Sequence, residues 1–165
     1  MREQEEIMKV FFSGMINGWA NPEAKKSLVS SIPGAKMISF KYGRSFKFVD
    51  VYITNPESRV STGFTFIYRF SAKKLVPVWT MSYWGTYPKE IAQFVKKALM
   101  SAYQDKVFCG GRGPGTFIDN QKGLIYINDT SPGCTFENFS GMEKVISMVT
   151  GKILGFHRFR GQILT

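Results

Sequence analysis

The spacing of apolar residues predicts two amphipathic helices and hints at a third. From Pro88 to Gln104, apolar side chains recur every three or four residues, and lysines occupy the opposite face. This stripe consists of Ile91, Phe94, Val95, Ala98, Leu99 and Ala102. A second stripe of Ile7, Val10, Phe11 and Met15 predicts a helix from about Gln4 to Gly18. Asn21-Pro22-Glu23 is typical of a helix start, so we expect one further short helix that ends by Pro33.

The remaining apolar segments alternate with polar residues or are rich in β-branched and aromatic side chains. Such segments are typical of strands, and turn sequences rich in glycine, proline and asparagine separate them. The expected strands are 45–54, 62–70, 76–84, 123–129, 135–149 and 152–164. Thr150-Gly151-Lys152 is expected to form a tight turn between the last two.

The six strands divide into two similar sets of three. The segment 51–55 (VYITN) is similar to 125–129 (IYIND), and 83–85 (YWG) is similar to 159–161 (FRG). A helix precedes each set, which indicates two α-β-β-β repeats over residues 4–87 and 88–165; chance similarity between aromatic-rich strands is the alternative. We therefore expect a single α+β domain over residues 1–165, with one antiparallel sheet of about six strands and the helices packed on one face.

The sequence CGGRGPG, residues 109–115, raises the question of a phosphate-binding loop. A Walker-type loop joins a strand to a helix and ends in Gly-Lys-Ser/Thr, whereas this segment follows a helix and precedes a strand. We therefore expect a turn in which Gly110, Gly111, Gly113 and Gly115 supply positive φ angles. We expect the side chain of Arg112 to be held outward, either to meet an anionic ligand or to pair with an acid such as Asp119 or Glu143.

Charge is distributed unevenly along the chain. The net charge is +10, and residues 24–112 contain 15 basic and four acidic residues. Such a basic centre favours anionic partners, nucleic acid among them, or simply a solvated surface. No segment approaches the roughly 20 apolar residues of a membrane span, and the first residues do not resemble a secretory signal. We therefore expect a cytoplasmic protein with reduced Cys109 and Cys134.

Five short motifs occur in a definite order along the chain. They are 31–35 (SIPGA), 50–52 (DVY), 76–85 (VPVWTMSYWG), 112–114 (RGP) and 139–143 (FSGME). In this order they resemble an uncharacterised bacterial family, domain of unknown function 5680, over about residues 8 to 165. The resemblance implies an accessory or sensing module, because members often follow a helix-turn-helix domain. The chain departs from the family pattern at 157–161 (HRFRG), where a Phe-His-Gly-Gly strand is usual, so a role for His157 in that register is not implied.

The sequence offers few residues for metal or covalent chemistry. Only Cys109, Cys134 and His157 are thiol or imidazole groups, and a structural zinc site usually needs four such ligands. We expect no metal and no cofactor. A Cys109–His157 nucleophile pair has no group to orient its base. Glu137 and Glu143 are expected to be a solvated pair at a sheet edge.

Aromatic residues near positive charge are the stronger functional signal. Strand alternation places Trp79 and Tyr83 on one face and Trp84 on the other. These residues either belong to the core or form a pocket with Arg112 for an anionic or aromatic ligand. The candidate ligand-binding residues are therefore Arg112, Trp79, Tyr83, Trp84, Glu143 and His157.

The function expected from the sequence is a ligand-binding or sensing module without catalysis, with a small molecule or a protein as its partner. A nucleic-acid-binding protein that uses the basic centre is the alternative, and a small enzyme is the third reading.

Overall fold

The computed structural model describes residues 2–72 and 74–165, which form two helices and nine strands. The helices are α1 (Arg2–Ile16) and α2 (Lys89–Gln104). The strands are β1 (Ser27–Leu28), β2 (Lys36–Tyr42), β3 (Phe46–Thr54), β4 (Val60–Ser71), β5 (Lys74–Thr86), β6 (Thr116–Asp119), β7 (Leu124–Thr130), β8 (Asn138–Ser147) and β9 (Ile153–Ile163). No helix in the described part of the chain is long and apolar enough to cross a membrane.

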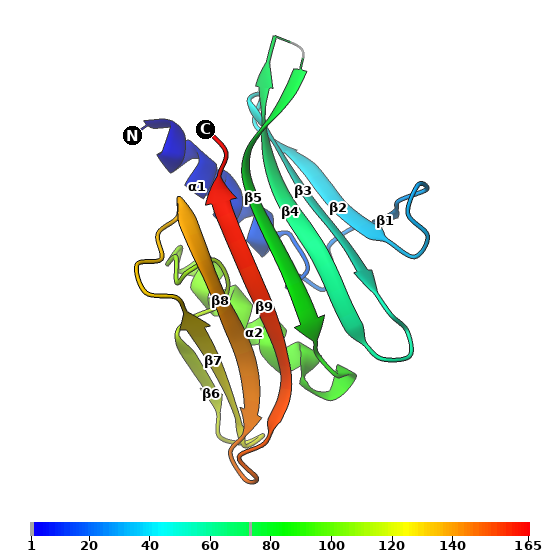
Figure 1. Ribbon diagram of the computed structural model, residues 1–165, viewed down its shortest axis with the longest axis vertical. Helices are drawn as coiled ribbons and strands as arrows, with labels where there is room; N and C mark the ends of the chain where they lie inside the picture. The colour runs from blue at the N-terminus through cyan, green and yellow to red at the C-terminus, as the bar shows by residue number, and fades with distance from the viewer. Residues whose placement is uncertain (1, 73) are drawn as a thin grey trace.

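All nine strands belong to one antiparallel sheet, in the order β1-β2-β3-β4-β5-β9-β8-β7-β6. Both helices lie behind this sheet in Figure 1, which confirms the α+β class and the antiparallel sheet. Strands β5 and β9 pair at its centre, with Tyr83 directly opposite Phe159. Within the sheet, the first half of the chain therefore meets the second half along this one pair of strands.

The expected number of strands was too small. Each of the six expected strands is present, but β1, β2 and β6 add to them. The strand β2 lies between Pro33-Gly34 and Gly43, whose turn signals conceal a seven-residue strand. The short helix expected at Asn21 is also wrong, because Asn21 Oδ1 accepts a hydrogen bond from the Glu23 backbone N–H in a turn.

The two halves of the chain do not match the expected α-β-β-β units. After each helix come at least four strands, and the last strands of the halves, β5 and β9, pair with each other. Strand pairing places Asp50 beside Thr65 in the first half and Asn128 beside Glu143 in the second. The residues that face each other across these strand pairs therefore differ between the two halves.

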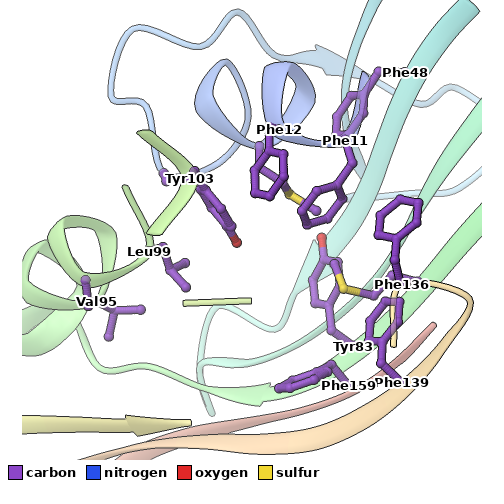
Figure 2. Packing of buried hydrophobic residues seen from close by; sticks show 14 of the residues in the cluster. Phe11, Phe12, Phe48, Tyr83, Val95, Leu99, Tyr103, Phe136, Phe139 and Phe159 are labelled. Atoms are coloured by element: carbon purple, nitrogen blue, oxygen red, sulfur yellow. The ribbon is translucent and has the colours of Figure 1, made fainter. Parts of the chain in front are cut away.

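The core fills the space between the helices and the sheet, and it is rich in aromatic residues (Figure 2). Phe94 on α2 is buried in the same cluster as Trp79 and Met81 on β5, as the helical stripe predicts. Trp79 is fully buried, and its ring stacks on Phe136 and Phe139. Glycines make room for large rings in the sheet: a side chain at Gly63 would collide with the opposite Tyr83.

Candidate functional site

A cavity of about 140 Å³ lies between the helices and the sheet. Its deep part is lined by buried residues that include Asp50, Tyr83, Tyr103 and Arg112. Apart from Ala92 on α2, the lining residues that keep some solvent exposure lie near the β3–β4 turn and after α1: Trp19, Tyr52, Thr54, Arg59 and Ser61. A ligand would therefore enter from this end of the sheet.

Arg112 and Glu143 form a buried ion pair beside the cavity. Arg112 Nε donates to Glu143 Oε1 at 2.7 Å, and the side chains are 8% and 0% exposed. The Tyr126 hydroxyl donates to Glu143 Oε2 at 2.5 Å and accepts a hydrogen bond from the Gly113 backbone N–H. Burial alone would lower the pKa of Arg112, but the negative charge of Glu143 raises it above its usual value, so the guanidinium stays charged.

The position of Arg112 corrects one expectation and confirms another. The side chain does not point outward from the glycine turn, because only 7% of the residue is exposed. It pairs with Glu143, one of the two acids named as partners, whereas Asp119 accepts a hydrogen bond from the Lys122 backbone N–H. The expected solvated pair of Glu137 and Glu143 is therefore wrong, since Glu143 is fully buried.

The glycine turn supports the ion pair through two different constraints. Gly110 and Gly111 have φ angles of 78° and 105°, as expected for a turn that leaves a helix. Gly113 and Gly115 do not have positive φ, contrary to the prediction. At Gly113 the constraint is space, because a Cβ atom would lie 2.6 Å from the Tyr126 hydroxyl oxygen. Asn128 Nδ2 donates to the carbonyl oxygens of Cys109 and Gly113 and holds the turn to the sheet.

We expect Gly111→Val to lower the free energy of unfolding by more than about 2 kcal/mol. A β-branched residue resists the positive φ, and its Cβ atom would lie 2.2 Å from the Phe139 ring. The matched control is Gly115→Val, because nothing lies within 4 Å of a Cβ atom there. Urea denaturation of both variants gives the comparison. Equal losses would show that the turn does not constrain the fold at Gly111.

A second polar cluster surrounds Asp50 in the deep part of the cavity. The hydroxyls of Thr65 and Tyr83 donate to Asp50 Oδ1 at 2.8 and 2.9 Å. Burial raises the pKa of the Asp50 carboxyl, although both hydrogen bonds and the charge of Arg112 oppose the rise. The Arg112 guanidinium carbon lies 5.1 Å from the centre of the Tyr83 ring, so Tyr83 connects the two clusters.

His157 lies between the polar clusters and the mouth of the cavity. Its ring stacks between Tyr87, with centroids 4.5 Å apart, and Tyr83, at 6.0 Å. Nε2 lies 3.1 Å from Ser61 Oγ, whereas Nδ1 is buried and has no hydrogen-bond partner. Burial and the nearby charge of Arg112 hold the pKa of His157 well below its ordinary value of 6.5, so the ring is neutral.

Arg59 stands at the mouth in an unusual backbone conformation. It has a φ of 63° in the β3–β4 turn, a position that a glycine would occupy without strain. Its side chain lines the cavity, and its Nε atom is buried without a hydrogen-bond partner. The positive φ and the buried Nε atom without a partner distinguish Arg59 from the other residues at the mouth.

Two arrangements that could support catalysis are incomplete among the residues that the structure describes. Ser61 and His157 resemble the first two members of a hydrolytic triad, but within the described residues no acid contacts Nδ1 of His157. The same part of the chain contains no cluster of three His, Cys, Asp or Glu residues that could hold a metal ion. What remains is a set of hydrogen-bonding groups and aromatic walls around an enclosed space.

The candidate residues from the sequence separate into three groups. Arg112, Tyr83 and His157 line the cavity, and Glu143 holds Arg112 from behind. Trp79 lies in the core away from the cavity, and Trp84 lies on the opposite face of the sheet.

Sequence reasoning missed Asp50 and Arg59 as cavity residues. The motif 50–52 (DVY) was a usable signal for Asp50, because a carboxylate within an apolar strand needs a partner. For Arg59 the sequence contains no comparable signal, because its positive φ cannot be predicted from the neighbouring residues.

Comparison with known proteins identifies a family for this chain. The model of a family described as domain of unknown function (DUF5680) matches residues 60–163. The chain belongs to the DUF5680 family. No curated protein and no solved structure matches it.

The DUF5680 match covers most of the candidate site. Tyr83, Arg112, Glu143 and His157 fall inside the matched residues. The motifs 31–35 (SIPGA) and 50–52 (DVY) lie before them, so Asp50 and the turn after α1 contribute to the cavity from outside the match. The match therefore confirms the resemblance expected from the sequence over a shorter stretch of chain.

Proposed function

We propose that this protein is a non-catalytic binding module whose cavity takes a small molecule with one aromatic ring and one acidic group. The observation that carries this proposal is Nδ1 of His157, a buried polar atom without a hydrogen-bond partner that belongs to a residue lining the cavity. A buried polar group without a hydrogen bond costs about 1–3 kcal/mol, and a ligand would remove that cost.

The size and walls of the cavity support a ring-sized ligand. A cavity of about 150 Å³ is known to accept one benzene molecule, and this one measures about 140 Å³. Aromatic and apolar side chains such as Phe48, Met81 and Leu99 form much of its lining. A flat ring would gain dispersion contacts on both faces.

The charge of the lining supports an acidic group on the ligand. The charged lining residues are two arginines and one aspartate, and the raised pKa of Asp50 weakens its competition for a cation. Arg112 uses only Nε in its pair with Glu143, so its two terminal nitrogens have no hydrogen bond within the described part of the chain. Two arginines that approach one carboxylate from the deep part and the mouth would provide charge-assisted hydrogen bonds.

Three small probes test the proposal by thermal shift. Benzoate has the ring and the charge, benzamide has the ring alone, and acetate has the charge alone. At about 10 mM benzoate and a Kd near 1 mM, linkage predicts a rise in melting temperature of about 3–6 °C, with smaller rises for the other two. Equal responses to all three, or none, would contradict the proposal.

Two variants locate the binding in the cavity. We expect Arg59→Gln to abolish most of the benzoate response and to fold normally, because Arg59 is half-buried at a turn. Arg112→Lys keeps the charge and loses the planar fork, so it should weaken the response as well. The control is Arg158→Gln, an exposed arginine on the opposite face of the sheet. A loss in the control equal to that in Arg59→Gln would show that benzoate binds elsewhere.

A further inference from the structure

The face of the sheet turned away from the helices is a second unusual surface. It faces the viewer in Figure 1, in front of both helices. Phe64 on β4 and Trp84 on β5 are 50% and 48% exposed there. Exposed aromatic residues of this size on a sheet face call for an explanation, since water is a poor solvent for them.

Strand pairing places two arginines next to these rings. Trp84 is directly opposite Arg158 on β9, and the Arg158 guanidinium carbon lies 5.6 Å from the centre of the Trp84 ring. In the adjacent row, Phe64 pairs with Ser82, and Ser82 pairs with Arg160. A shallow hollow runs beside Trp84 and is lined by Trp84, Met142, Ile153, Phe156 and Arg158. The surface thus alternates aromatic rings, small polar residues and cations over β4, β5 and β9.

The aromatic residues continue along β4 as a row. The Phe64 and Phe66 rings stack with centroids 6.1 Å apart, and Tyr68 follows Phe66 at 5.8 Å. Thr80 and Gln162 lie in the same row of the sheet as Phe66. Their side chains can form hydrogen bonds and are small enough not to block a ligand from the aromatic rings. A row of flat rings beside a row of cations matches the alternation of bases and phosphates in a nucleic-acid strand.

We propose that this open face of the sheet binds single-stranded nucleic acid, with bases stacked on Trp84 and Phe64 and phosphates held by Arg158 and Arg160. Unpaired bases are required, because a duplex hides its base faces from such a surface. The basic centre of the chain suggested nucleic-acid binding as the alternative function. The surface proposed here is a different one, because Arg158 and Arg160 lie on β9, outside residues 24–112.

The charges on the open face argue against a second copy of the chain as its partner. Within the described residues, neither Arg158 nor Arg160 takes part in an ion pair. Asp129 on β7 already pairs with Lys144 at 2.6 Å, which offsets its negative charge. Stacking two such faces would bury unpaired arginines against one another, at a high desolvation cost. A polyanion meets the same arginines with complementary charge.

Fluorescence anisotropy with a labelled oligothymidylate of about 12 nucleotides tests the proposal, and the same strand annealed to its complement is the comparison. We expect the single strand to bind at least about fivefold more tightly than the duplex. Trp84→Ala should weaken single-strand binding by roughly fivefold or more, and Trp84→Phe should retain most of it, because a stacked base is lost only in the first variant. Equal affinity for strand and duplex, or an unchanged affinity in Trp84→Ala, would overturn the proposal.

Salt dependence tests the arginines separately from the rings. Arg158→Gln with Arg160→Gln should reduce the slope of log K against log salt by about 1.4, since each phosphate contact on a single strand contributes about 0.7. The matched control is Lys89→Gln with Lys97→Gln, which removes two exposed charges from α2 on the other side of the sheet. An equal change in the control pair would overturn the assignment of this face.

The test is independent of the cavity. Trp84 and Arg158 lie on the opposite face of the sheet from Asp50 and His157, so the Trp84→Ala variant should keep its full response to benzoate. Heparin is a polyanion without bases. If heparin bound tightly and Trp84→Ala weakened neither heparin binding nor single-strand binding, the attraction would be due to charge alone and the stacking proposal would be overturned.

Discussion

Glu143→Ala will lower the free energy of unfolding by about 3–5 kcal/mol, the largest effect we expect from a polar substitution in this protein. The change leaves the Arg112 guanidinium buried without its carboxylate, and the Tyr126 hydroxyl loses its acceptor as well. A buried charge without a partner costs several kilocalories because water no longer solvates it. Urea denaturation followed by far-UV circular dichroism measures the loss.

Two further variants make this result specific to the buried pair. The double variant Arg112→Met with Glu143→Leu removes both charges, so its loss should be smaller than that of Glu143→Ala alone. Asp129→Ala breaks the exposed pair with Lys144 in the same sheet and should cost less than about 1 kcal/mol. If Glu143→Ala cost no more than Asp129→Ala, the Arg112–Glu143 pair would not hold the glycine turn to the sheet.

Phe94→Ala will lower the free energy of unfolding by about 3–5 kcal/mol. Phe94 is 1% exposed on the buried face of α2, and its ring lies 5.7 Å from that of Phe117. The truncation removes a large apolar side chain and leaves a cavity that the packed sheet cannot fill. Thermal unfolding by calorimetry gives the change.

The matched control for Phe94 is the same substitution on the open face of the sheet. Phe64→Ala removes an equal volume from a side chain that is 50% exposed, so no cavity forms, and the loss should remain under about 1 kcal/mol. A large loss at Phe64 together with a small one at Phe94 would mean that the hydrophobic core lies on the face of the sheet that carries Phe64, and not between the sheet and the helices.

The sequence correctly predicts the features that depend on local periodicity, namely which side chains of a helix or strand are buried. The stripe of α2 from Ile91 to Ala102 matches its buried residues, and the expected opposite orientation of Trp79 and Trp84 is confirmed by their burial. Strand β2 escaped prediction because flanking turn residues dominated a short alternating segment. Strand β6 has only four residues, too few for a pattern to stand out.

The cavity depends on pairings between distant strands, which local patterns do not encode. Glu143 on β8 is directly opposite His157 on β9, whereas Asp50 on β3 belongs to a different row of the sheet. The sequence named Glu143 as a partner for Arg112, but the direction of the Arg112 side chain depended on where α2 ends relative to β8. Only the assembled sheet fixes that relation, so the outward orientation expected from the turn alone was wrong.

The central pairing of β5 with β9 has a consequence for the order in which the protein folds. Strand β9 is the last strand of the sheet along the chain, yet it lies in the middle of it, between β5 and β8. During synthesis β1 to β5 can pair with one another, but the free edge of β5, which carries Trp79 and Tyr83, stays unpaired until β9 emerges from the ribosome. An open apolar edge of this kind recruits other strands, so protection by a chaperone matters most in that interval. Contacts so distant in sequence also make the final closure of the sheet the slow step.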